Sequence, residues 1–215
     1  TSSNLVGVTE YAKQSIIDDQ QKLNSINLKT NSSVVMYTRS AGKHGKDPKI
    51  IILGTEPDHC YVLLLDKLPT GQVKKILAGI KSIISYDTKS VLQLFIELGV
   101  PLPEVEHDVL VGSFLLDSLR REQTLSELAE ADIGYNGSLE DLPDEELTVR
   151  AGEITSVINS LYDFQYKQLQ QLPSVANLAK QVEWPVILVL AKMEHEGIKL
   201  DVSYLHDMAE RLSDQ

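Results

Sequence analysis

The sequence predicts an α/β protein, in which a mixed central sheet is flanked by helices. Two observations predict it. Three short runs rich in Val, Ile and Leu come early, at 33–37, 49–54 and 60–66. A fourth short apolar run at 82–87 lies between two stretches with helical periodicity, and mainly helical patterns follow it. This order, strands first, then a β-α-β alternation and then helices, is typical of a mixed sheet covered by helices.

The early runs, SVVMY, KIIILG and CYVLLLD, are separated by Gly, Pro and Asp, which favour turns. We expect three strands that are antiparallel neighbours. The connection at 40–48, SAGKHGKDP, contains Gly-Lys but lacks the spacing of a phosphate-binding loop, so we expect a solvated hairpin loop.

Helices are predicted at 71–80, 88–98, from 109 onward, and at 124–135. The 88–98 helix has an apolar face and a glycine stop at Gly99. Asp108 stands where an N-cap would, after a short strand around Val105. The longest helix is expected from about Glu145. Its apolar stripe consists of Leu147, Ala151, Ile154, Ile158 and Leu161.

The pattern changes at Glu183, where a helix with Pro185 in its first turn is expected to end at Gly197. Its apolar face would comprise Val186, Val189, Leu190 and Met193. A second helix is expected from Val202. Residues 1–32 are polar, with one amphipathic stretch at 10–23.

Composition limits the classes of protein. The 215 residues suit one domain with an extra piece, and no apolar run could span a bilayer or act as a signal peptide. Because the first residue is Thr, we expect an excised fragment or a processed product. A single cysteine, Cys60, excludes an internal disulfide and a cysteine metal cluster, and its apolar neighbours predict a buried thiol.

The net charge of −11 disfavours a general DNA-binding surface, since DNA affinity depends largely on Lys and Arg. The five histidines, at 44, 59, 107, 195 and 206, are not paired at metal-ligand spacing, which favours surface or helix-end roles. The acidic run at 140–146, EDLPDEE, fits a solvated loop before a helix, or an interaction patch.

Residues 183–201, EWPVILVLAKMEHEGIKLD, closely resemble the segment that joins the exonuclease and polymerase domains of bacterial DNA polymerase I and its family A relatives. The matching residues are Glu183, Pro185, Met193, Glu194, Gly197, Ile198 and Asp201. Residues 85–118 resemble the 3′–5′ exonuclease domain of that family. The matching residues there are Asp87, Leu92, Gly99, Asp108, Leu115, Leu116 and Asp117. The resemblance runs from about Val34 to the end.

This resemblance implies a ribonuclease-H-like exonuclease fold over residues 1–180, followed by the helical start of a polymerase domain at 183–215. It implies a parent enzyme that is a DNA-directed DNA polymerase of replication and repair. That parent would use Mg²⁺, would act in the bacterial cytoplasm at the nucleoid, and would contact DNA. The fragment itself is expected to need no cofactor and to bind DNA weakly at most. Its partner would be the polymerase domain of the same chain.

The exonuclease of that family binds two divalent ions, and holding two such cations close together takes several carboxylates. The family supplies Asp-x-Glu on the first strand, an Asp after the fourth strand, and Tyr-x-x-x-Asp on a late helix. These positions fall on Tyr37 and Arg39, on Asp87, and on Arg150 and Ile154. Only Asp87 remains as a candidate ligand. The resemblance therefore implies a domain without catalytic or metal-binding residues that serves as a structural platform.

Two alternatives stay open. A slip of one residue on the late helix would bring in Glu153, as in an active exonuclease with displaced ligands. The chain could also be a non-catalytic protein-interaction module. Arg39 could contact phosphate or form a structural ion pair, of which we favour the second. Asp87 is expected to cap the helix that begins at Thr88 and to pair with Arg39 or Arg150.

Overall fold

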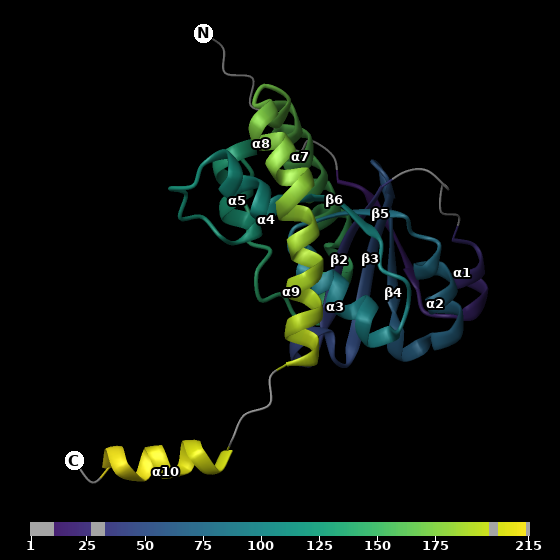
Figure 1. Cartoon of the computed structure of the whole chain (residues 1–215). Helices are drawn as coiled ribbons and strands as arrows, with labels where there is room; N and C mark the ends of the chain where they lie inside the picture. Colours follow the sequence, from purple (N-terminus) through teal and green to yellow (C-terminus); the bar gives the residue numbers. More distant parts are fainter. Residues whose placement is uncertain (1–10, 27–32, 198–201, 214–215) are drawn as a thin grey trace.

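The computed structural model describes residues 11–26, 33–197 and 202–213. A six-stranded sheet with the order β1-β4-β3-β2-β5-β6 lies at its centre (Figure 1). The strands are β1 (Lys13–Ile17), β2 (Val34–Ser40), β3 (Pro48–Glu56), β4 (His59–Leu64), β5 (Ser82–Ser85) and β6 (Glu104–Asp108). The pairs β2–β3 and β3–β4 are antiparallel, while β1–β4, β2–β5 and β5–β6 are parallel. The predicted mixed sheet is therefore confirmed.

Strand β1 was not predicted from the sequence. It lies in the polar stretch before the three apolar runs and pairs with β4 at the edge of the sheet. Its five residues are mostly exposed, and only Ile17 is buried. A strand with one buried side chain has no alternating apolar pattern, so periodicity could not reveal it.

Alternate side chains of the central strands enter two separate cores, as the period of a strand requires. On β3, Ile51 and Leu53 belong to the first core, whereas Ile50 and Ile52 belong to the second. Helices α1 (Gln20–Asn24), α2 (Thr70–Ala78), α3 (Thr88–Leu98) and α9 (Trp184–Glu196) cover the first core. Helices α5 (Leu125–Ile133), α6 (Asp144–Val149) and α7 (Ala151–Gln170) cover the second. Helix α4 (Val109–Leu116) touches both.

Helix ends follow the capping signals of the sequence. Gly99 takes a left-handed conformation after α3, and Asp108 accepts a hydrogen bond from Val111 N–H at the start of α4. Thr124 and Glu127 form a reciprocal capping box at the start of α5. Cys60 is fully buried, as expected, and burial raises the pKa of its thiol to about 11.

The long helix expected from Glu145 is interrupted. Helix α6 ends at Val149 and α7 begins at Ala151, because Arg150 departs from helical geometry with φ −98° and ψ 12°. The predicted stripe from Leu147 to Leu161 is nevertheless fully buried on both sides of the break. A Cβ atom on Gly152 would lie only 1.7 Å from the carbonyl oxygen of Ala12. The start of α7 therefore packs directly against the segment before β1.

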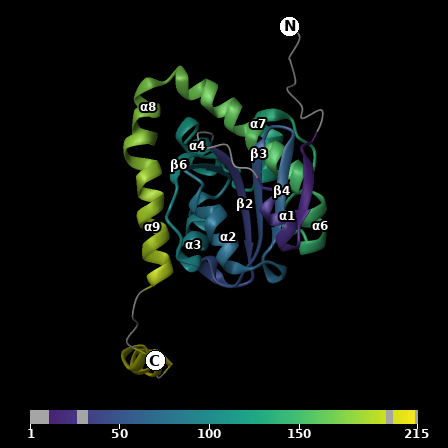
Figure 2. The ribbon, with the colours of Figure 1, turned by 90° about the vertical axis from the view of Figure 1, so that its right-hand side faces the viewer.

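Helix α8 (Pro173–Leu178) continues through a π-helical segment, Ala179–Glu183, into α9, which lies alongside α3 (Figure 2). The apolar face predicted for α9 is not the face that packs. Trp184, Ile187 and Ala191 are buried, whereas Val186, Val189, Leu190 and Met193 are exposed. Apolar residues of α9 lie on most sides of the helix, so the sequence pattern does not predict which side packs against the core.

Helix α10 (Val202–Ser213) begins where expected. The matched residues Ile198 and Asp201 lie outside the described part of the chain. No helix among the described residues is long and apolar enough to cross a membrane.

Candidate functional site

Three of the positions singled out by the resemblance lie on or directly after two adjacent strands. Tyr37 and Arg39 lie on β2, and Asp87 follows β5, the parallel neighbour of β2. Tyr37 and Arg39 oppose Ile52 and Ile50 on β3, so they share the sheet face that α7 covers. Tyr37 and Asp87 line one cavity of about 150 Å³. Its other lining residues are Thr38, Ser85, Tyr86, Ser90 and Val91.

Arg39 is bound by the acidic segment at 140–146. Its Nη1 donates to the Leu142 carbonyl oxygen at 3.1 Å and lies 4.0 Å from the Asp144 carboxylate. The expected ion pair is therefore present, although Asp144 is exposed and such a pair contributes little by itself. The hydrogen bond to a backbone carbonyl orients the guanidinium toward the segment before α6.

Asp87 caps α3, as predicted. Its carboxylate accepts a hydrogen bond from Ser90 N–H at 3.3 Å and from the Ser90 hydroxyl at 2.5 Å. The predicted pairing of Asp87 with an arginine is wrong. Arg39 bonds to the segment at 140–146. Arg150 bonds to the Glu153 carboxylate and to the Ser138 carbonyl oxygen. The hydroxyl of Ser90, and not an arginine, is the second donor to the Asp87 carboxylate.

Arg150 and Glu153 form their own polar cluster at the start of α7. The Arg150 Nε donates to Glu153 at 2.6 Å, and the Tyr135 hydroxyl donates to the same carboxylate at 2.7 Å. Burial alone would raise the pKa of Glu153, but the hydrogen bonds from Arg150 and Tyr135 outweigh it and hold this pKa below the usual range. Both oxygens of Glu153 are thus engaged by protein donors, and Ile154 is fully buried in the second core.

Asp108 has a larger role than its predicted N-cap. One of its oxygens accepts from Val111 N–H and the other from Thr88 N–H, each at 2.8 Å. This fully buried carboxyl therefore joins the first turns of α3 and α4. Burial raises its pKa to about 7, despite those two hydrogen bonds. No local sequence pattern predicts the bond to Thr88, because Thr88 lies 20 positions away.

His107, the neighbour of Asp108, is also buried. It hydrogen-bonds to the Gln165 side chain at 2.7 Å and makes edge contacts with the rings of Tyr162 and Trp184. Burial lowers the pKa of His107, which favours the neutral ring. The surface or helix-end role expected for His107 is therefore wrong.

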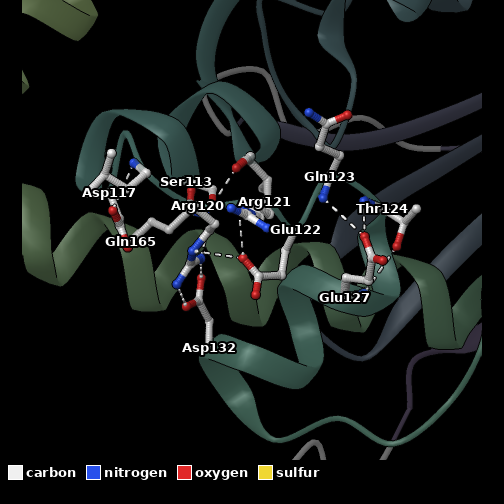
Figure 3. A network of polar contacts seen from close by, with 12 residues as sticks. Ser113, Asp117, Arg120, Arg121, Glu122, Gln123, Thr124, Glu127, Asp132 and Gln165 are labelled. Carbon is white, nitrogen blue, oxygen red and sulfur yellow. Dashed lines mark hydrogen bonds and ion pairs between the residues drawn. The ribbon is translucent and has the colours of Figure 1, made fainter.

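A second cavity, of about 580 Å³, lies beside Tyr86. It is lined by Tyr86, Leu110, Val111, Ser113, Phe114, Arg120, Glu122, Gln123 and Glu183. Figure 3 shows how the connection between α4 and α5 is fixed there: Arg120 donates to both carboxylate oxygens of Asp132, at 2.7 and 2.5 Å, and to Ser113. The Tyr86 hydroxyl donates to the Gln123 carbonyl. Both Arg120 and the Tyr86 hydroxyl, which line this cavity, are thereby bonded to other groups of the protein.

The residue types at these positions do not fit a centre for two divalent ions. A guanidinium repels metal cations, and isoleucine offers no ligand atom. Within the described ranges, no group of three or more His, Cys, Asp or Glu residues is arranged to hold a metal ion.

The chain has a ribonuclease-H-like exonuclease fold. Solved structures share it: NrnC of Brucella melitensis bound to pGG (TM-score 0.67, 12% identity, covering 89% of this chain and 98% of that one). RNase D of Trypanosoma brucei gives a TM-score of 0.57 at 14% identity, covering 71% of this chain and 64% of that one. The POL domain of Pol1 from M. smegmatis, in complex with DNA primer-template and dNTP, gives 0.69 at 19% identity. This match covers 85% of the present chain but 31% of the other.

The particular relatives are bacterial DNA polymerases I, so the predicted resemblance is confirmed. The enzyme of Synechocystis sp. is 26% identical over 183 residues, which are 75% of this chain and 19% of that protein. That of Pseudomonas aeruginosa is 22% identical over 130 residues, or 54% of this chain and 14% of the relative. The chain thus spans less than a fifth of the curated relatives it matches. No protein-family model matches it.

Replacing Asp87 separates its capping role from any role of its charge. We expect Asp87→Ala to lower the free energy of unfolding by about 1 kcal/mol, because Ser90 N–H loses its acceptor. Asp87→Asn should stay within a few tenths of a kcal/mol of the wild type, since Asn is an equally good N-cap. Urea denaturation measures both. Equal losses for the two variants would contradict the capping account.

The buried carboxyl of Asp108 should make stability depend on pH. Its pKa is raised on folding, from an ordinary value of 3.8 to about 7, so the folded state binds more protons between these values. Stability relative to Asp108→Asn should therefore fall as the pH rises from about 4 to 7, by an amount on the order of a few kcal/mol. Denaturant midpoints of both proteins across this range test it. A difference that is independent of pH would show that Asp108 titrates normally.

Proposed function

We propose that this chain is the exonuclease-like part of a DNA polymerase of the polymerase I type and that this part has lost two-metal proofreading activity. One observation carries the proposal. On β2, beside Asp87, the positions that the resemblance assigns to Asp-x-Glu hold Tyr37 and Arg39, and Arg39 is hydrogen-bonded to the Leu142 carbonyl.

The chemistry supports this proposal. In two-metal hydrolysis, paired cations stabilise the attacking and the leaving oxygen, and carboxylates must offset the repulsion between those cations. Asp87 alone supplies one negative charge, and it is already bonded to Ser90. The alternative with displaced ligands would need Glu153, which Arg150 and Tyr135 already engage.

The remaining role we propose is a platform for the polymerase domain of the same polypeptide. An apolar stripe runs along α8, the π-helical segment and α9 at steps of three and four residues, and each member is at least 40% exposed. The stripe consists of Leu178, Val182, Val186, Val189, Leu190 and Met193. A continuous apolar face of this kind is typical of an interaction surface. Four of its six residues lie on the segment, 183–201, that resembles the junction with a polymerase domain.

In this proposal the boundary falls near residues 180–183, and residues 183–215 lead into the polymerase domain. That domain would supply the nucleotidyltransferase activity, the Mg²⁺ ions and the main DNA contacts, within the bacterial cytoplasm at the nucleoid. The net charge of −11 fits a part that leaves DNA binding to its partner domain.

A nuclease assay tests the lost activity. We expect no shortening of a 5′-labelled single-stranded oligonucleotide with Mg²⁺ or Mn²⁺, because three of the four ligand positions lack carboxylates. Asp87→Ala is the matched control, since activity that survives in it comes from a contaminant. Metal-dependent shortening from the 3′ end that disappears in Asp87→Ala would overturn the proposal.

A further inference from the structure

Polar contacts centred on Glu194 hold the last turn of α9 against α3 and against the short helix η1 (Lys43–Gly45). One carboxylate oxygen of Glu194 accepts from Lys89 Nζ at 2.9 Å. The other accepts from Gln93 Nε2 at 2.8 Å and lies 3.6 Å from His44 Nδ1. One side chain of α9 thus contacts two other elements.

The next residue of α9 reaches the same two elements. His195 Nε2 lies 3.8 Å from the Glu97 carboxylate on α3, and His195 Nδ1 lies 3.4 Å from the His44 carbonyl oxygen on η1. We call this set of contacts, made by Glu194 and His195 with His44, Lys89, Gln93 and Glu97, the α9 clasp. Its members come from three segments that are far apart in the sequence.

The hairpin loop is shaped to lie against α3. Gly45 has a φ of +76°, and a Cβ atom there would come within 2.6 Å of the Gln93 backbone. Only glycine permits both this conformation and this approach. The position of His44 beside Glu194 is therefore set by the backbone of the loop.

The contacts within the α9 clasp differ in their protection from water. Gln93 is 4% exposed, whereas the side chains of Lys89 and Glu194 are each 37% exposed. The hydrogen bond from Lys89 is the main reason that the pKa of Glu194 lies below its usual range, and Gln93 adds to this effect. The Lys89 pair should weaken in high salt, while the bond from Gln93 should not.

Apolar packing does not reach the last turn of α9. The buried residues of this helix, Trp184, Ile187 and Ala191, lie in its earlier turns, and Met193 is 62% exposed. The helix ends at Glu196, and its C-cap residue, Gly197, has a φ of +71°. We infer that Glu194 is a positioning residue and that the α9 clasp fixes the direction in which the chain leaves the exonuclease-like body. This inference does not depend on the proposed function; if both hold, the clasp orients the polymerase domain.

Hydrogen exchange of the 215-residue chain, followed by mass spectrometry, tests the inference. In Glu194→Gln, one acceptor oxygen becomes an amide donor that faces Lys89 or Gln93. We expect amide exchange over 191–197 to rise about five- to tenfold. Glu196→Gln is the matched control, because this substitution removes the same charge from the same helix end. Glu196 itself makes no hydrogen bond or ion pair within the described residues. Glu196→Gln should exchange like the wild type.

Two further measurements separate a local clasp from general loosening. Trp184 is the single tryptophan and lies in the buried part of α9, so its emission should be unchanged in Glu194→Gln. Lys89→Met should raise exchange over 191–197 by a smaller factor, and it tests the clasp even if Glu194→Gln fails to fold. Equal exchange in Glu194→Gln and Glu196→Gln would overturn the inference. So would a red-shifted Trp184 emission with faster exchange throughout α3 and α9.

Discussion

The apolar contact between the central sheet and α7 is the constraint on which the rest of the site depends. Ile154 is fully buried in the second core, together with Ile52 and Val62 of the central strands. This packing fixes the rotation of α7, because a shift of one residue would turn the helix by about 100° and expose its apolar stripe. Arg150 and Glu153 are consequently held at the rim of the contact, where they bond to each other.

The polar groups around this contact are hydrogen-bonded to other groups of the protein. Arg39 donates a hydrogen bond to the segment before α6. Asp87 accepts from the first turn of α3, and Asp108 accepts from the first turns of both α3 and α4. A buried carboxyl with two backbone donors, such as Asp108, restricts how those helices can move relative to each other. The ends of β2 and β5 therefore form a region organised for stability. The order of the strands in this region is that of an exonuclease fold. The hydrogen bonds of Asp87 and Asp108, however, serve to join and cap helices.

Much of the fold could be predicted because its signals are local. Strands β2, β3 and β4 appear as apolar runs, and α3 is delimited by its Asp87 cap and its Gly99 stop. Features set by distant residues could not be predicted. Arg39 bonds to a carbonyl 103 positions away, and the prediction that Asp87 pairs with Arg39 or Arg150 is wrong. Likewise, apolar residues lie on both sides of α9, so its sequence does not determine which side is buried. The buried side is the one that packs against α3 and β6.

Binding of Mn²⁺ measures most directly whether the β2–β5 end holds a metal centre. In a calorimetric titration of the chain with Mn²⁺, our account predicts no saturable binding into the millimolar range, because Tyr37, Arg39 and Ile154 offer no carboxylate. The same titration of Asp87→Ala should be indistinguishable from that of the wild type. Saturable micromolar binding that is lost in Asp87→Ala would contradict the account, since it would show that Asp87 takes part in a metal site.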